Sequence, residues 1–482
     1  MRRFLCFLCA LLLSAAISDA RPLELAHVFS DHAVLQRESS VAVWGWGEAG
    51  KTVTISASWL KKSVRTKVND DGSWRVTLLT LKAGGPYSLT VKSGKEKIQI
   101  NDILLGEVWL CSGQSNMQMP LSGFGFQEVE GATETIMDAP RFQDRIRVLN
   151  VMSDTTHVLQ ADIAETWEKA SPGTASRTSA VAYFFAKRLT ESLGVPVGII
   201  VNAWGGSRIE PWMSRDAVLD AGVSDGELRE IDALREIAGR WPNSVGSCWN
   251  GRMAPLAGYG IKGFLWYQGC SNIGQNCYDK LQAAMVRLWR ESWGLGELPF
   301  IYALLAPYEH GDADGRWRPF FVETQLRTQE LVNSVWAVST ETLGNKVTVH
   351  PAKKKEVADM MVLRALQNVY GMDCGVSIEL PRLQEADFSS DGSVRVRLTE
   401  VWSNLGSISS REVTGFELAG EDRQFHLANA SIDWDGETII VSCPEVPHPV
   451  AVRYGWRNWM GANLQKSNGI PVPPFRSDDW DY

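Results

Sequence analysis

The sequence lacks the long apolar and long basic runs that mark two large classes of protein. Of its 482 residues, 48 are Lys or Arg and 56 are Asp or Glu, which gives a formal net charge of -8. Without a basic run, we expect no nucleic acid partner. After Ala16 no stretch reaches the roughly 20 apolar residues of a membrane-spanning helix, so no membrane span is expected.

Metal-ligand patterns are also absent. The chain has only 7 His, with no HExxH motif and no His-rich cluster. Cys270 and Cys277 lack CxxC spacing and neighbouring His ligands, so neither zinc nor another metal or cofactor is expected. These two cysteines are close enough in sequence to form a disulfide. The sequence leaves disulfide pairing and oligomeric state open.

The N-terminus has the pattern of an export signal. Arg2 and Arg3 precede an apolar run from Phe4 to Ala16, and small residues follow up to Ala20. This pattern predicts a signal peptide over residues 1–20, cleaved before Arg21, and hence a secreted or periplasmic protein.

Three regions follow, each with its own periodicity. Residues 21–101 alternate in short runs separated by Gly and Asp-Gly turns, which predicts a β-sandwich domain. Residues 102–372 alternate apolar strand-like runs with helical segments, which predicts an α/β domain with a mostly parallel sheet. In residues 373–482 the short alternation returns, and a second β-sandwich is predicted.

A phosphate-binding pattern near the start is misleading. Residues 45–52 read GWGEAGKT and satisfy GxxxxGK[ST]. A P-loop needs a helix directly after the Lys, but residues 52–56 are β-branched and alternate as in a strand. We therefore predict a hairpin here and no nucleotide site.

A second motif is more specific. The apolar run at residues 107–110 leads into a Gly-containing turn that presents Ser115. A serine nucleophile belongs at the carboxyl end of a sheet strand. Met117 replaces the second Gly of a GxSxG elbow, which argues against an ordinary α/β-hydrolase. On this segment alone, a helix-capping Ser is the favoured explanation.

Further segments along the chain resolve this ambiguity. They are GQSNM at 113–117, NAWGGSRIEPW at 202–212, WYQGCSN at 266–272 and VHP at 349–351, flanked by FSDHAVLQR at 29–37 and AVRYGW at 451–456. Together they resemble the sialate O-acetylesterase family of SGNH-type serine esterases, over nearly the whole mature chain. The resemblance implies an SGNH-hydrolase-like three-layer catalytic domain and an enzyme that removes acetyl groups from O-acetylated sialic acid or related sugars.

The resemblance also implies roles for residues. Ser115 is the expected nucleophile and His350 its base, since a His with a pKa near neutrality suits proton exchange with serine. The expected oxyanion donors are the backbone amides of Ser115 and Gly206 and the side-chain amide of Gln268. Expected substrate-binding residues are Asn116, Trp204 and Asn272.

Two departures from the family pattern bear on activity. Cys270 stands where relatives carry the Glu of QGES, and Thr348 stands where they carry the Asp that precedes the catalytic His. Glu341 is the nearest carboxylate that can support His350, and a backbone carbonyl is the other candidate. Two alternatives therefore stay open: an acetylesterase for a plant polysaccharide such as acetylated xylan, and a catalytically impaired homologue that binds glycans.

Overall fold

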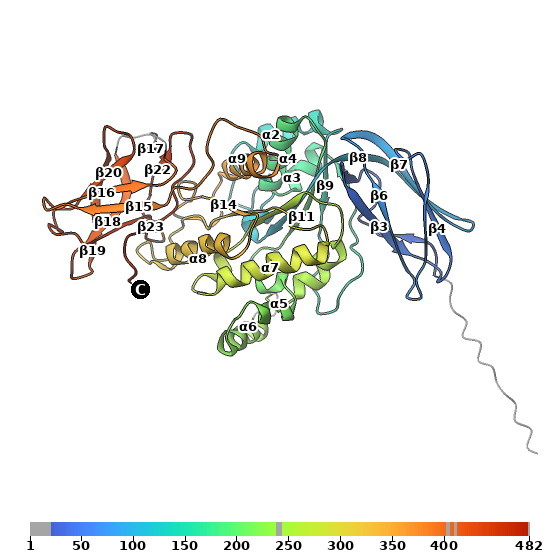
Figure 1. The fold of residues 1–482 in the computed structure, drawn as a ribbon, viewed down its shortest axis with the longest axis horizontal. Helices are drawn as coiled ribbons and strands as arrows, with labels where there is room; N and C mark the ends of the chain where they lie inside the picture. The colour runs from blue at the N-terminus through green and yellow to red at the C-terminus, as the bar shows by residue number, and fades with distance from the viewer. Residues whose placement is uncertain (1–20, 238–242, 402–404, 409–411, 481–482) are drawn as a thin grey trace, which may run out of the picture.

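The computed structural model describes residues 21–237, 243–401, 405–408 and 412–480. The predicted signal peptide, residues 1–20, lies outside them. The chain forms an elongated molecule in which an α/β region lies between two β-rich regions (Figure 1). No helix in the described part of the chain is long and apolar enough to cross a membrane.

The central sheet is mostly parallel, as predicted. Its strand order is β10-β9-β11-β8-β12-β13-β14, and only the edge pair β10–β9 is antiparallel. The strands are β8 (Glu96–Gly113), β9 (Ile146–Asn150), β10 (Glu168–Lys169), β11 (Val197–Ala203), β12 (Gly263–Tyr267), β13 (Phe300–Ala303) and β14 (Val335–Val338). Every residue of β11 and β12 is buried, as continuous apolar runs in a covered parallel sheet require. The carboxyl ends of these parallel strands share one edge.

Helices cover both faces of this sheet (Figure 1). The long helices α4 (Ala180–Leu193) and α9 (Lys354–Arg364) pack on one face, and α7 (Tyr278–Trp293) and α8 (Trp317–Leu331) pack on the other. Shorter helices lie in the connections: α1 (Ser115–Gln118), α2 (Ala132–Asp138), α3 (Pro172–Arg177), α5 (Arg215–Asp220), α6 (Asp225–Ile237), and single turns at Ala139–Phe142, Glu210–Trp212, Trp249–Met253, Ala254–Leu256, Cys270–Asn272 and Ala365–Val369.

The N-terminal region is β-rich. One sheet contains β1 (Glu24–Leu25), β3 (Ser40–Trp46) and β6 (Ser73–Leu79), while β2 (Val34–Gln36), β4 (Thr52–Ala57), β5 (Val64–Lys67) and β7 (Gly84–Ser93) lead into β8. β8 runs without a break through the predicted boundary at residues 101–102 and into the central sheet. β4 begins directly after Lys51 with alternating burial, so the helix that a P-loop requires is absent, as predicted. The segment is not the predicted hairpin, however, because β3 and β4 pair with strands of two different sheets and not with each other.

The C-terminal region is also β-rich. One antiparallel sheet has the order β15-β16-β20-β19-β18-β21-β23, and a smaller one pairs β17 with β22. The strands are β15 (Leu383–Phe388), β16 (Ser393–Leu398), β17 (Leu405–Ser407), β18 (Val413–Ala419), β19 (Phe425–Ile432), β20 (Thr438–Ser442), β21 (Ala451–Tyr454), β22 (Leu464–Lys466) and β23 (Phe475–Arg476). One large sheet with its own core thus replaces the two comparable sheets predicted for a sandwich.

Candidate active site

The strand-to-helix turn after β8 presents Ser115. β8 ends at Gly113, which has φ 143°, and a Cβ there would come 2.2 Å from the carbonyl oxygen of Tyr267 on β12. Only glycine tolerates this approach. Ser115 opens α1 and is half-buried, and within the described residues neither its hydroxyl nor its amide N–H has a hydrogen-bond partner. The turn therefore leaves both groups available to a substrate.

His350 lies on the loop between β14 and α9, and a glutamine holds its ring. The Nδ1–H of His350 donates to Oε1 of Gln127 at 2.7 Å, and Nε2 of Gln127 donates to Oγ1 of Thr348 at 2.7 Å. The ring of Phe124 contacts the imidazole edge-on, with 5.4 Å between centroids. This arrangement fixes the tautomer that keeps Nε2 unprotonated and able to accept a proton.

Asn116 ties the serine turn to the histidine loop. Its Nδ2 donates to the carbonyl oxygen of Val349 at 3.0 Å, and its Oδ1 accepts from the Nζ of Lys354. Asn116 is only 2% exposed. The structure thus differs from the predicted substrate-binding role: this side chain is buried and joins the neighbours of Ser115 and His350.

The electrostatics of the site keep His350 neutral. Burial, followed by the positive charge of Lys354, lowers the pKa of His350 to about 4. Burial also lowers the pKa of Lys354 to about 7, and its Nζ lies 5.7 Å from the ring centroid of Tyr267. Near neutral pH the imidazole is therefore in the form that acts as a general base.

Lys354→Met is expected to move the acid limb of kcat/KM to higher pH. The limb reports protonation of His350, and removal of the cation removes one of the two causes that lower its pKa. Burial, the larger cause, persists, so the limb is expected to stay below pH 6.5, the ordinary His value. A pH series of initial rates checks this. Lys355→Met, which removes an exposed lysine on the same helix, is the control, and an unmoved limb in Lys354→Met would contradict the assignment.

The turn after β11 supplies a second unoccupied amide. The N–H of Gly205 donates to Oε1 of Gln118 at 2.8 Å. Gly206 has φ 74°, and its N–H has no hydrogen-bond acceptor among the described residues. Of the two glycines, Gly206 is therefore the one able to donate to an oxyanion, as expected from the resemblance.

Gln268 and Asn272 support this turn through buried side-chain hydrogen bonds. Nε2 of Gln268 donates to the carbonyl oxygen of Ser207 at 3.1 Å and to Oδ1 of Asn272 at 2.7 Å, so both amide hydrogens are committed. Nδ2 of Asn272 donates to Glu210 and to Gln275, and Asn272 is fully buried. This geometry differs from the predicted roles: Gln268 presents no free N–H to an oxyanion, and Asn272 does not reach a substrate. Both residues instead position the Gly206–Ser207 backbone.

Glu341 does not support His350, and the prediction for this residue is corrected. Its carboxylate forms a two-point ion pair with Arg318, in which Nη1 and Nη2 bond Oε1 and Oε2, respectively. Glu341 and Arg318 are 5% and 1% exposed, and burial raises the pKa of Glu341. A buried guanidinium requires a countercharge, which explains why this carboxylate is committed elsewhere.

Glu341→Ala is expected to destabilise the fold by about 3–5 kcal/mol, because it leaves the buried charge of Arg318 without a partner. Esterase activity per folded molecule is expected to change little. Urea unfolding and initial rates measure the two effects. Glu385→Ala, which breaks an exposed pair with Arg397, should cost at most about 1 kcal/mol. A large loss of kcat at unchanged stability would instead restore the predicted catalytic role.

Trp204 and the cysteines are the remaining residues for which the sequence analysis raised a role. Trp204 is half-buried, and the guanidinium of Arg252 lies 4.9 Å from its ring centroid. The six cysteines of the described chain are all free, so the suggested Cys270–Cys277 disulfide does not form in this structure. Burial raises the pKa of Cys270 to about 12, so this thiol does not carry the negative charge of the Glu it replaces.

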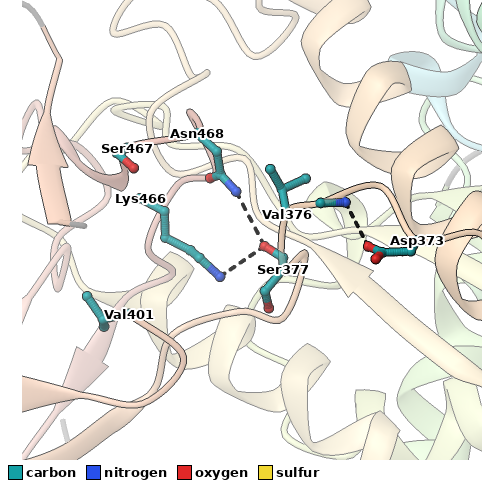
Figure 2. A pocket seen from close by; sticks show the side chains of 8 residues that line it. Asp373, Val376, Ser377, Val401, Lys466, Ser467 and Asn468 are labelled. Atoms are coloured by element: carbon teal, nitrogen blue, oxygen red, sulfur yellow. Dashed lines mark hydrogen bonds between the residues drawn. The ribbon is translucent and has the colours of Figure 1, made fainter. Parts of the chain in front are cut away.

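A cavity of about 560 Å³ lies within the C-terminal region, between residues 373–377 and the turn at 466–468 (Figure 2). Lys466 lines this cavity, and its Nζ donates to the carbonyl oxygens of Ser377 and Glu379, both at 3.0 Å. None of the predicted site residues lines it. The polar groups of the cavity wall join the chain at residues 377–379 to the turn at 466–468.

Two residues of the site, Gln127 and Lys354, carry no sequence signal of a functional role. Gln127 is separated from His350 by 223 positions and lies in a loop without a motif, so no local signal pointed to it. Lys354 lies four residues after His350 at the start of α9, and its place within a run of three lysines suggested an exposed face rather than a buried cation.

This combination of fold and site is that of an ester hydrolase. Residues 105–363 match the family model described as carbohydrate esterase, sialic acid-specific acetylesterase. The crystal structure of a carbohydrate acetylesterase from Xanthomonas citri aligns with a TM-score of 0.82 at 32% identity, covering 95% of this chain and all of that one. The sialate O-acetylesterases of Rattus norvegicus and Homo sapiens are 26% and 27% identical over 93% of this chain and 93% and 91% of their own. The chain belongs to the sialic acid-specific acetylesterase family of carbohydrate esterases.

Proposed function

We propose that this chain hydrolyses O-acetyl esters on sialic acid or a related sugar, with Ser115 as nucleophile and His350 as general base. One observation above all supports this proposal: His350 gives its Nδ1–H to Gln127, and its loop is fixed to the residue that follows Ser115. This leaves Nε2 as the proton acceptor in a site whose serine hydroxyl has no other partner among the described residues.

The proposed reaction has two steps. Oγ of Ser115 attacks the acetyl carbonyl carbon while Nε2 of His350 takes its proton, and the amides of Ser115 and Gly206 stabilise the oxyanion. The intermediate collapses, the C–O bond to the sugar breaks, and His350 returns the proton to the leaving sugar hydroxyl. Water, deprotonated by His350, then attacks the acetyl carbon of the acetyl–Ser115 ester. The bond between that carbon and Oγ breaks, acetate leaves, and His350 returns the proton to Oγ of Ser115.

Acetate release from 9-O-acetyl sialic acid, acetylated xylan and p-nitrophenyl acetate, assayed side by side, tests the proposal. Release from the sialic acid ester at the highest kcat/KM supports it. Acetylated xylan as the better substrate would support the alternative, an acetylesterase for a plant polysaccharide. If no ester is cleaved, a glycan-binding role replaces the enzymatic one.

We extend the proposal to architecture and location. The catalytic region, residues 102–372, is proposed to be an SGNH-type three-layer domain between domains at 21–101 and 373–482. Residues 1–20 are proposed to direct export. The serine at the carboxyl edge of the sheet and the charge and apolar pattern of the N-terminus support these assignments.

A further inference from the structure

The loop after α1 carries a two-residue turn whose flanking residues both contact His350. The N–H of Phe124 donates to the carbonyl oxygen of Gln127 at 2.9 Å, and the N–H of Gln127 donates back at 2.6 Å. The side chain of Gln127 accepts from His350, and the ring of Phe124 packs edge-on against it. The tip, Gly125 and Phe126, is therefore held in a fixed relation to the histidine proposed as the base.

Phe126 at this tip is fully exposed, with a relative accessibility of 105%. Val347, 74% exposed, lies next to Thr348 on the facing loop, and the Gln127–Thr348 hydrogen bond joins the two loops. Each apolar side chain thus neighbours one member of that bonded pair. Neither contributes to the core, so packing does not account for an aromatic residue here.

We propose that Phe126 is a stacking platform for a sugar ring of the substrate glycan while an acetyl group of that glycan occupies Ser115, with Val347 on the facing loop as a second apolar side chain. A sugar ring presents an apolar C–H face that packs on an aromatic ring. Two side chains match one ring, whereas a protein partner needs about 800 Å² of surface on each side. The inference rests on the proposed function and adds that glycan recognition extends beyond the acetyl ester.

The test compares a glycan ester with an ester that has no ring. Acetate release is measured for the parent, Phe126→Ala, Phe126→Trp and Trp434→Ala on ethyl acetate and on the sugar ester that the parent cleaves with the higher kcat/KM, either 9-O-acetyl sialic acid or acetylated xylan. Trp434, on the turn between β19 and β20, is 93% exposed and serves as the matched control for loss of a surface aromatic. Phe126→Ala is expected to raise KM for the sugar ester about threefold to tenfold, with ethyl acetate hydrolysis unchanged. Phe126→Trp is expected to keep the KM of the parent.

Each other outcome has a defined meaning. An equal loss on both esters would overturn the platform, because Phe126 would then act through His350. An unchanged KM for the sugar ester in Phe126→Ala, or an equal rise in Trp434→Ala, would also overturn it. A parent that cleaves neither these esters nor 9-O-acetyl sialic acid would refute the proposed function itself, which is a separate result.

Discussion

Ser115→Ala is expected to abolish ester hydrolysis and leave the fold intact. The covalent step requires the hydroxyl. In serine proteases, which also use a serine nucleophile and a histidine base, removal of a catalytic residue costs about 10⁴- to 10⁶-fold in kcat. Within the described residues the hydroxyl makes no hydrogen bond, so its loss removes no structural contact. Initial rates on p-nitrophenyl acetate, together with a thermal melt, measure both effects.

The control for this experiment is Ser122→Ala, an exposed serine in the following loop. It should retain the parent rate. A serine-reactive phosphonate should label Ser115 in the parent, and mass spectrometry locates the adduct. Substantial turnover in Ser115→Ala, or labelling at another residue, would refute the nucleophile assignment.

Gln127→Ala is expected to lower kcat by about tenfold to a hundredfold. His350 then loses the acceptor of its Nδ1–H and with it the fixed tautomer, a loss comparable to one buried hydrogen bond. The expected loss is smaller than the roughly 10⁴-fold cost of neutralising the triad Asp of serine proteases, because an amide stabilises the protonated imidazole less than a carboxylate does. Gln99→Ala, an exposed glutamine of the N-terminal region, is the control.

Gln127→Glu separates a positioning role from a merely structural one. A carboxylate at this place raises the pKa of His350, since it favours the charged imidazolium. The acid limb of the pH profile is therefore expected to move upward from its position near pH 4, and kcat above the limb is expected to rise. If Gln127→Ala is silent and Gln127→Glu leaves the limb in place, Gln127 does not orient the base.

The structure gives the two departures from the family pattern a common setting. Thr348 provides no charge for His350, but its hydroxyl orients Gln127, which reaches Nδ1 in place of a carboxylate. Cys270 provides no negative charge for Lys354, and burial without that charge lowers the pKa of the lysine. Both changes favour a neutral, weakly basic His350.

Much of the fold followed from periodicity. The predicted strand runs at residues 52–56 and 107–110 lie in β4 and β8, because short apolar or alternating runs bounded by turn residues have few other stable conformations. The number of sheets in the C-terminal region could not be predicted from periodicity. Periodicity predicts which side of a strand is buried but not which strands pair, so one large sheet and two comparable sheets are equally consistent with it.

The sequence alone indicated Ser115 and His350: GQSNM follows a predicted strand, where a serine nucleophile belongs, and VHP is one of the segments that resemble the family. It determined the need for a partner at Nδ1 of His350 but not the identity of that partner. Only the tertiary structure decided that Gln127 serves this role, that Glu341 pairs with Arg318, and that Asn116 and Asn272 are buried supports. The Glu341–Arg318, Gln127–His350 and Asn116–Val349 contacts join residues 23, 223 and 233 positions apart, and such pairings depend on how loops and helices pack, which no local pattern encodes.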